Sequence, residues 1–257
     1  MANRERSGPK DHRSDRQCRQ EHGLRPINNL APGARVGIRL ASRYWNRYFA
    51  AERPAFNTNP NRFLVEMVKG RRPGKALDVA MGQGRNSIWL AQEGWDVTGF
   101  DIARDAVQSA DRQACKLGLK IHVEVNTIDA FAYGEYRWDL ILASYAGAGP
   151  PADHVEHALK PGGILILETF HDDALKSMRI CGVRFKTGEL LARYSGLRTV
   201  RYEEPITMPD FAPKPARVVR LCAEKAGGEL IEIPTRLKLR GLGIRQVRGP
   251  RVPAQTA

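Results

Sequence analysis

The stretch of sequence that decides the fold is residues 76–87, which read Ala76-Leu77-Asp78-Val79-Ala80-Met81-Gly82-Gln83-Gly84-Arg85-Asn86-Ser87. A short apolar run, typical of a buried strand, is followed by two glycines and then by residues that can open a helix. Glycine is needed where a backbone turns sharply and where a ligand approaches it closely. Both needs arise at the first strand-to-helix turn of a doubly wound sheet, so the stretch predicts that fold and a ligand at this turn.

The alternation of short apolar runs with helical stretches continues after this turn. We expect parallel strands at residues 76–80, 96–100, 121–125, 140–143 and 164–169, and helices near residues 86–92, 103–117, 153–159 and 188–194. Two later strands, 197–202 and 217–223, are joined by a proline-containing loop over 205–215 and should pair antiparallel, because no helix separates them. The predicted class is α/β, a Rossmann-like doubly wound sheet of seven strands, mostly parallel with an antiparallel last strand, with helices on both faces.

The two ends of the chain differ in composition from its centre. Residues 1–40 mix charged residues, glycine and proline without a helical or strand period, and we expect a disordered basic tail there. The folded domain should span residues 41–225, and residues 226–257 form either a basic C-terminal tail or an added edge strand. Before the sheet we expect an aromatic helix over 42–51 and a second helix after Asn59, with Pro60 in its first turn.

Charge and cysteine usage exclude several classes of function. Most of the net charge of +13 lies in the two ends, so any binding of nucleic acid would be through the basic tails alone. No apolar run is long enough to cross a bilayer, and we expect a cytoplasmic protein without a membrane partner. The cysteines at 18, 115, 181 and 222 are too scattered for a zinc site or a disulfide framework. His154 and His157 could share a helix face, but a solvated helix surface explains them more simply than a metal site.

Two acidic residues narrow the ligand of the glycine turn. Asp101 ends the second expected strand, where a carboxylate can accept both hydroxyl hydrogens of a ribose. A dinucleotide site also uses such an acid. It requires a third small residue, a glycine or alanine, three positions after the second glycine, and this chain has Ser87 there. Asp78 would repel a pyrophosphate and attract an ammonium group. The alternative is that Asp78 caps a helix or satisfies backbone amides.

At this point the sequence resembles the class I S-adenosylmethionine-dependent methyltransferases. Asp78, Gly82 and Gly84 match their first motif, with Ala80 where its first glycine usually lies. The runs Gly84-Arg85-Asn86-Ser87 and Gly94-Trp95-Asp96-Val97-Thr98-Gly99-Phe100-Asp101 look like the tellurite-resistance and thiol-methyltransferase-like branch. Leu159-Lys160-Pro161-Gly162-Gly163 resembles the turn before the fifth strand of that fold. The resemblance covers roughly Phe56 to Lys225.

The resemblance implies S-adenosyl-L-methionine as the cofactor and assigns residues to it. Asp101 would hold the ribose hydroxyls, and the segment that begins at Asp129 would recognise the adenine. The methyl of Ala80 would take up space near the carboxypropyl arm of the cofactor. The full set of expected cofactor-binding residues is Asp78, Ala80, Met81, Gly82, Gly84, Asn86, Asp101, Ile102, Asp129, Ala130, Phe131 and Ser144.

The implied reaction is in-line methyl transfer to a small molecule, for which the protein mainly aligns the reactants. The acceptor should lie beyond the fourth and fifth strands, near Tyr145 and His171, although Tyr145 equally fits a pocket wall. Neither is assigned as a catalyst. Trp45, with Tyr48 and Phe56, would either form a lid over the substrate or pack the amino-terminal helix against the sheet. Two other readings stay open: a methyltransferase acting on RNA or protein, and a non-catalytic protein that binds a nucleotide or NAD.

Overall fold

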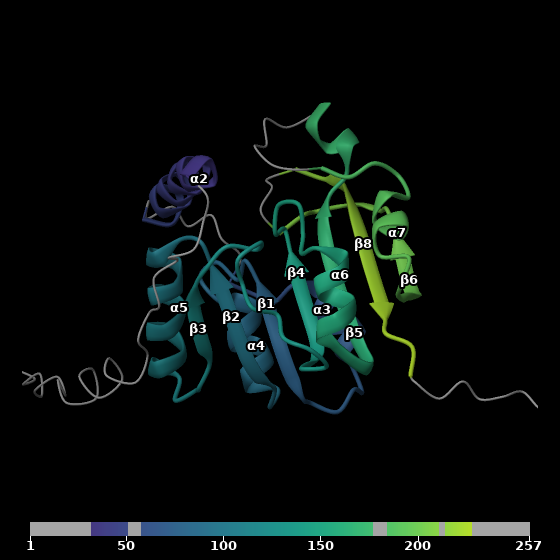
Figure 1. The fold of residues 1–257 in the computed structure, drawn as a ribbon, viewed down its shortest axis with the longest axis horizontal. Helices are drawn as coiled ribbons and strands as arrows, with labels where there is room; N and C mark the ends of the chain where they lie inside the picture. The colour runs from purple at the N-terminus through teal and green to yellow at the C-terminus, as the bar shows by residue number, and fades with distance from the viewer. Residues whose placement is uncertain (1–31, 51–57, 177–183, 211–213, 228–257) are drawn as a thin grey trace, which may run out of the picture. The chain divides into compact units, whose positions relative to one another are not determined.

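The computed structural model describes residues 32–50, 58–176, 184–210 and 214–227. Its sheet has eight strands in the order β3-β2-β1-β4-β5-β8-β6, with the short β7 pairing with β8 (Figure 1). The strands are β1 Lys75–Val79, β2 Asp96–Asp101, β3 His122–Val125, β4 Trp138–Ser144, β5 Leu159–Phe170, β6 Arg198–Glu203, β7 Ile206–Thr207 and β8 Ala216–Glu224. The prediction of a mostly parallel Rossmann-like sheet is confirmed.

The strand pairs follow from the connections between them. β1 pairs with β2 and β4, β2 with β3, and β4 with β5, all in parallel, because a helix or a long loop returns the chain each time. β8 is antiparallel to both β5 and β6. For β6 this pairing is the expected one, because the chain passes from β6 to β8 without a helix. The structure has one strand more than the seven expected. β7 is only two residues long and lies inside the segment predicted to be a loop.

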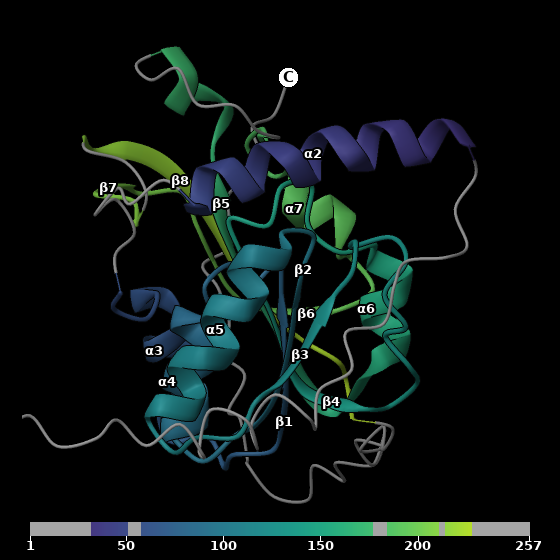
Figure 2. The ribbon, with the colours of Figure 1, turned by 90° about the vertical axis from the view of Figure 1, so that its left-hand side faces the viewer.

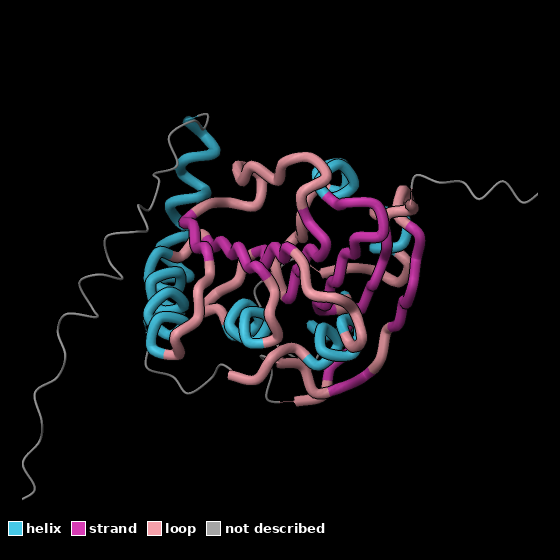
Figure 3. The backbone as a smooth tube through the Cα atoms, turned by 90° about the horizontal axis from the view of Figure 1, so that it is seen from below, coloured by secondary structure: helices cyan, strands magenta, loops and turns pink. Residues whose placement is uncertain are grey.

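The helices cover the two faces of the sheet (Figures 2 and 3). On one face, α3 (Arg62–Val68), α4 (Arg85–Gln92) and α5 (Arg104–Lys116) contribute to a buried core that includes Phe63, Leu90 and Val107. On the other face, α6 (Ala152–Ala158) and α7 (Glu189–Arg193) contribute Val155 and Leu190 to a second core. A 3-10 turn, η1, covers Asp172–Lys176. None of the helices in the described ranges is long and apolar enough to span a membrane.

The amino-terminal boundaries differ from those predicted. Helix α2 spans Pro32–Ala50, so residues 32–40 are helical rather than part of a disordered tail. Pro32 can occupy a first helical turn because its missing N–H would have no partner there. Helix α3 begins at Arg62 with Asn61 as its N-cap, so Pro60 precedes the helix instead of lying in its first turn. The rest of the amino-terminal tail, residues 1–31, and the predicted carboxyl-terminal tail from residue 228 lie outside the described residues.

The predicted turn before the fifth strand proves to be an irregularity inside β5. Trp138 pairs with Leu159 and Leu140 with Ile164, so β5 carries extra residues between two contacts with β4. Gly162 has a φ of 77°, which glycine adopts without strain. A Cβ on Gly163 would lie 2.8 Å from the carbonyl oxygen of Trp138 and 2.9 Å from that of Lys160. Gly163 is therefore required for the close approach of two backbones.

We predict that Gly163→Ala lowers the free energy of unfolding by about 1–3 kcal/mol, because rigid backbone atoms must move to admit the methyl group. Urea denaturation at constant temperature measures the change. Gly227→Ala is the control, because a Cβ on Gly227 would meet no atom within 4 Å. A loss that is equal in the two variants would contradict the steric explanation.

Candidate functional site

The candidate site lies where the carboxyl ends of β1, β2, β4 and β5 come together. The chain leaves β1 through α4, which contributes to one core, and leaves β4 through α6, which contributes to the other. Because β1 and β4 are adjacent and parallel, their diverging connections mark the switch point at which doubly wound sheets bind ligands, and we call the region around these two strand ends the crevice. The residues that follow these strands are therefore placed around one crevice.

The turn after β1 adopts left-handed backbone conformations at three positions. The φ angles are 54° at Ala80, 57° at Gly82 and 80° at Gly84. For alanine this conformation costs about 1–2 kcal/mol, in addition to the space that its methyl group takes. Gly84 also lets two helices approach, since a Cβ there would lie 2.7 Å from the Cβ of Ala110 on α5.

Asp78 is buried beneath this turn, with 1% of its surface exposed. Its carboxylate accepts a hydrogen bond of 2.7 Å from the hydroxyl of Ser87 and a second from the backbone N–H of that residue. Burial raises the pKa of Asp78 to about 7, although Ser87 and the nearby Arg85 act against that rise. Asp78 thus supports the first turn of α4, the structural role considered as an alternative, and it also places a poorly compensated carboxyl group at the crevice.

Asp101 connects the turn to the end of β2. One carboxylate oxygen accepts from the backbone N–H of Gly82 at 2.9 Å and the other from that of Ala103 at 2.8 Å. Burial raises the pKa of Asp101 above its ordinary value. The backbone N–H of Ile102 contributes a third hydrogen bond. A carboxylate can accept about four hydrogen bonds, so these three leave capacity for a ligand hydroxyl group.

The other expected cofactor residues fall into two groups. Asp129 and Ala130 are exposed after β3, at the edge of the crevice. Met81 and Phe131 instead point into the core, where Met81 packs against Gly99 and Phe131 stacks on Phe100 with ring centroids 4.2 Å apart. A contact of Met81 with a cofactor would therefore have to come from its main chain.

Two further predicted positions hold neighbouring helices in place. Asn86 is buried, and its Oδ1 accepts the backbone N–H of Asn61 at 2.8 Å, so it anchors the start of α3. The carbonyl of Ile102 accepts the hydroxyl of Ser42 on α2 at 3.2 Å. Both residues border the crevice. The side chain of Asn86 and the carbonyl of Ile102 are, however, used in hydrogen bonds within the protein.

One face of α2 contacts the glycine turn and the loop after β2. Ser42, Trp45, Asn46 and Phe49 share this face through their spacing of three and four residues. Asn46 accepts the backbone N–H of Asp105 at 3.3 Å, and the ring of Phe49 lies 3.2 Å from where a Cβ on Gly82 would be. The structure thus places Trp45 on the helix that covers the turn. Phe56, the third member of the proposed lid, lies outside the described residues.

Tyr145 and His171, near which the sequence predicts the acceptor, both have their polar atoms engaged. The hydroxyl of Tyr145 donates to Glu168 at 2.7 Å, and burial with the nearby Glu168 and Asp210 raises its pKa well above the ordinary range. His171 accepts the backbone N–H of Asp173 at Nδ1, and its Nε2 lies 3.1 Å from the hydroxyl of Thr187. Neither side chain is poised to remove a proton from an acceptor.

The structure also reveals a buried polar network that the sequence analysis missed. We call it the Glu168 network, and its members are Asn61, Tyr145, Glu168, Asp210 and Arg220. Asp210 joins it to the glycine turn through Arg85, whose Nη2 lies 2.6 Å from Asp210 and 3.3 Å from the Ser144 hydroxyl. The one signal in the sequence is a glutamate in the apolar run that forms β5.

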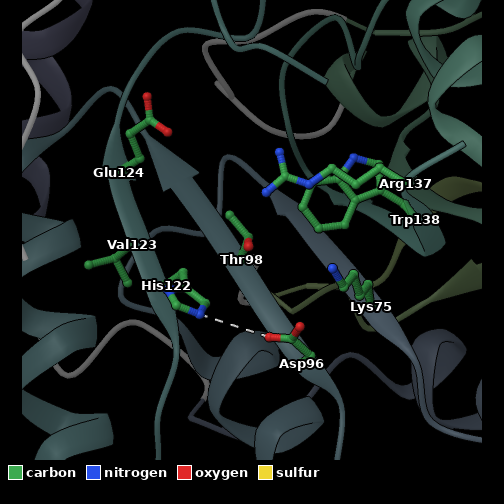
Figure 4. A pocket seen from close by; sticks show the side chains of 8 residues that line it. All are labelled: Lys75, Asp96, Thr98, His122, Val123, Glu124, Arg137 and Trp138. Carbon is green, nitrogen blue, oxygen red and sulfur yellow. Dashed lines mark ion pairs between the residues drawn. The ribbon is translucent and has the colours of Figure 1, made fainter. Parts of the chain in front are cut away.

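A cleft of about 290 Å³ lies at the opposite end of the sheet. Figure 4 shows its walls, with Asp96 and His122 facing each other at the beginnings of β2 and β3. The cleft is separate from the crevice, because parallel strands begin at one end and finish at the other. Within the described ranges, no three His, Cys, Asp or Glu side chains are grouped as metal ligands would be.

The chain is similar to several known proteins. The family model for the tellurite resistance protein TehB matches residues 46–210. Hemagglutinin 1 of Eikenella corrodens is 28% identical over 173 residues, which cover 64% of this chain and 57% of that protein. The ubiquinone biosynthesis O-methyltransferase of Pectobacterium carotovorum is 28% identical over 143 residues, or 52% of this chain and 59% of that protein. The chain thus spans less than two thirds of these relatives.

Among solved structures, TehB from Haemophilus influenzae shares the fold, with a TM-score of 0.55 and 21% sequence identity. The match covers 70% of this chain and 67% of that one.

We predict that Asp78→Asn removes part of the pH dependence of stability. Asp78 titrates near 7 in the folded state and near 3.8 when unfolded, so between these values only the folded state holds the proton. Its contribution to stability is therefore present below about pH 4 and is lost as the pH rises to about 7, at up to about 1.4 kcal/mol per unit. The difference in unfolding free energy between wild type and variant, measured in urea from pH 4 to 8, should fall accordingly. A constant difference would contradict the assignment.

Proposed function

This chain belongs to the tellurite resistance protein TehB family, a branch of the class I S-adenosylmethionine-dependent methyltransferases, and from that premise we propose that it methylates a small molecule. The observation that carries the proposal is the placement of Asp78 and Asp101 on the two sides of the glycine turn. A buried carboxylate beneath the turn suits an ammonium group, and a carboxylate at the end of β2 suits a ribose.

The residues around the crevice define how the cofactor would lie. Asp78 would attract the ammonium of its amino-acid part, Asp101 would accept hydrogen bonds from the ribose, and Asp129 would face the adenine. The sulfonium supplies a methyl group that is already activated, so the task left to the protein is alignment. Because Asp101 and Asp129 would hold the ribose and adenine near β2 and β3, the acceptor would approach from the side of β4 and β5.

The engaged state of Tyr145 and His171 supports an acceptor that needs no general base. The proton of Tyr145 is held by Glu168, and His171 is held between Asp173 and Thr187. A hydroxyl or ammonium acceptor would need a group to remove its proton, whereas a thiolate or another soft anion arrives ready to attack. We therefore propose a small, already deprotonated nucleophile as the acceptor.

The cofactor site is tested by the binding of S-adenosylhomocysteine, the product that retains the ammonium group. Asp78→Asn should weaken binding at pH 8 by about tenfold or more, because a charge-assisted contact with the ammonium is lost. Asp96→Asn is the matched control: it is the same chemical change on a half-exposed aspartate at the far end of the sheet. Calorimetry that shows no binding to the folded wild type would refute the cofactor assignment.

The acceptor class is tested with labelled S-adenosylmethionine and a set of simple thiols whose pKa values differ. The midpoint of the pH–rate profile should follow the pKa of each thiol, because the protein contributes no base of its own. Phenols and alkylamines serve as the comparison set. A midpoint that stays constant across the thiols would contradict the proposal, and label found only in added RNA would favour a macromolecular acceptor.

A further inference from the structure

Glu168 is a buried carboxylate whose oxygens are bound by three other side chains. It lies on β5, which has a neighbouring strand on each side, and only 2% of its surface is exposed. It accepts hydrogen bonds from Asn61 Nδ2 at 2.7 Å, Tyr145 Oη at 2.7 Å and Arg220 Nε at 2.5 Å. A buried charge is stable only when it is paired and hydrogen-bonded, so this carboxylate has a fixed position.

The same residue fixes both ends of Tyr145. The backbone N–H of Tyr145 donates to the carbonyl of Glu168 at 2.7 Å, while its hydroxyl donates to the Glu168 carboxylate. Tyr145 has a φ of 55°, a left-handed conformation that costs about 1–2 kcal/mol for a residue with a side chain. Its ring lies against Phe170, with centroids 5.0 Å apart. The surrounding contacts therefore hold this tyrosine in a strained and defined orientation.

The position of Tyr145 in the fold brings it to the reacting end of the crevice. Tyr145 directly follows β4. The hydroxyl of its neighbour Ser144 accepts a hydrogen bond of 3.3 Å from Nη2 of Arg85, at the start of α4. Asp101 lies on the other side of β1, at the end of β2. A cofactor whose ribose is held by Asp101 and whose amino-acid part is held over the turn would therefore present its methyl group toward the β4 side.

We infer that Glu168 is a positioning residue for methyl transfer: by accepting the hydrogen bond of the Tyr145 hydroxyl, it directs an electron pair of the Tyr145 oxygen toward the methyl group. The inference rests on the proposed function. The raised pKa of Tyr145 means that its hydroxyl keeps one proton at neutral pH, and Glu168 receives it. Toward other groups the oxygen acts as an acceptor, as it does toward the backbone N–H of Asp210 at 3.4 Å. A methyl group on a sulfonium carries partial positive charge, which an oriented oxygen attracts.

The test uses sinefungin, a cofactor analogue that carries an amine on carbon where the cofactor carries a methyl on sulfur. Its ammonium would donate to the Tyr145 oxygen, whereas S-adenosylhomocysteine has no group at that place. The measured quantity is the ratio of the Kd of S-adenosylhomocysteine to that of sinefungin, obtained by calorimetry. Tyr145→Phe and Glu168→Gln should each lower this ratio about tenfold, with the affinity for S-adenosylhomocysteine unchanged. The double variant should fall no further than the single ones, because the two residues act through one oxygen.

Glu203→Gln is the matched control for the loss of charge. Glu203 accepts a hydrogen bond of 2.9 Å from Nη1 of Arg220, the arginine whose Nε donates to Glu168. Its substitution therefore also removes one carboxylate charge beside this arginine. We expect this variant to keep the wild-type ratio. Urea denaturation of each variant verifies that it folds, and Tyr145→Phe, which leaves no charge unpaired, provides the test if Glu168→Gln does not fold.

The outcomes separate the inference from the proposed function. If the folded wild type binds neither ligand, the cofactor assignment fails and the inference falls with it. If both ligands bind and either Glu168→Gln or Tyr145→Phe keeps the wild-type ratio, the inference alone is overturned. The same holds if Glu203→Gln lowers the ratio as much as Glu168→Gln does, because the effect would then be one of charge and not of orientation.

Discussion

The rest of the structure depends on the burial of three carboxylates at the carboxyl ends of its parallel strands. Asp78, Asp101 and Glu168 are each at most 6% exposed, and a carboxylate removed from water must find hydrogen bonds within the protein. Each finds a different kind of partner: a serine for Asp78, backbone amides for Asp101, and a set of side chains that includes an arginine for Glu168. Satisfying these groups fixes the glycine turn, the end of β2 and the wall of the crevice.

The partners of these carboxylates connect elements that are distant in sequence. Asn61 caps α3 and donates its backbone N–H to Asn86 of α4. Its side-chain amide donates to both Glu168 and Asp210. Arg85 then links Asp210 back to the turn. Among the described residues, every buried side-chain nitrogen or oxygen has a hydrogen-bond partner. The crevice is therefore a pre-formed polar site, whose geometry is set by the same bonds that stabilise the fold.

Periodicity predicted the fold well because the signals are local. The parallel strands and their helices lie within a few residues of their expected positions, apart from β5, which begins five residues early. The helix over residues 32–40 was missed because its composition resembles a tail, and the strained backbone of Ala80 and Tyr145 leaves no trace in composition. The Glu168 network could not be predicted, since Asn61 is separated from Glu168 by 107 residues and from Asp210 by 149. Only the three-dimensional fold brings these residues together.

Asp78 and Glu168 differ in how the protein compensates the charge of the carboxylate. Glu168 lies 2.5 Å from a guanidinium, so its charge is compensated within the protein and can hold a neighbour in place. The hydrogen-bond partners of Asp78 are the neutral hydroxyl and the backbone N–H of Ser87, and the direction of the pKa shift indicates that burial outweighs these bonds. A cationic ligand would supply the compensation that Asp78 lacks, so part of the attraction for an ammonium group originates in the destabilised carboxyl itself. The Asp78 side of the crevice thus responds to charge, while the Glu168 side is fixed in advance.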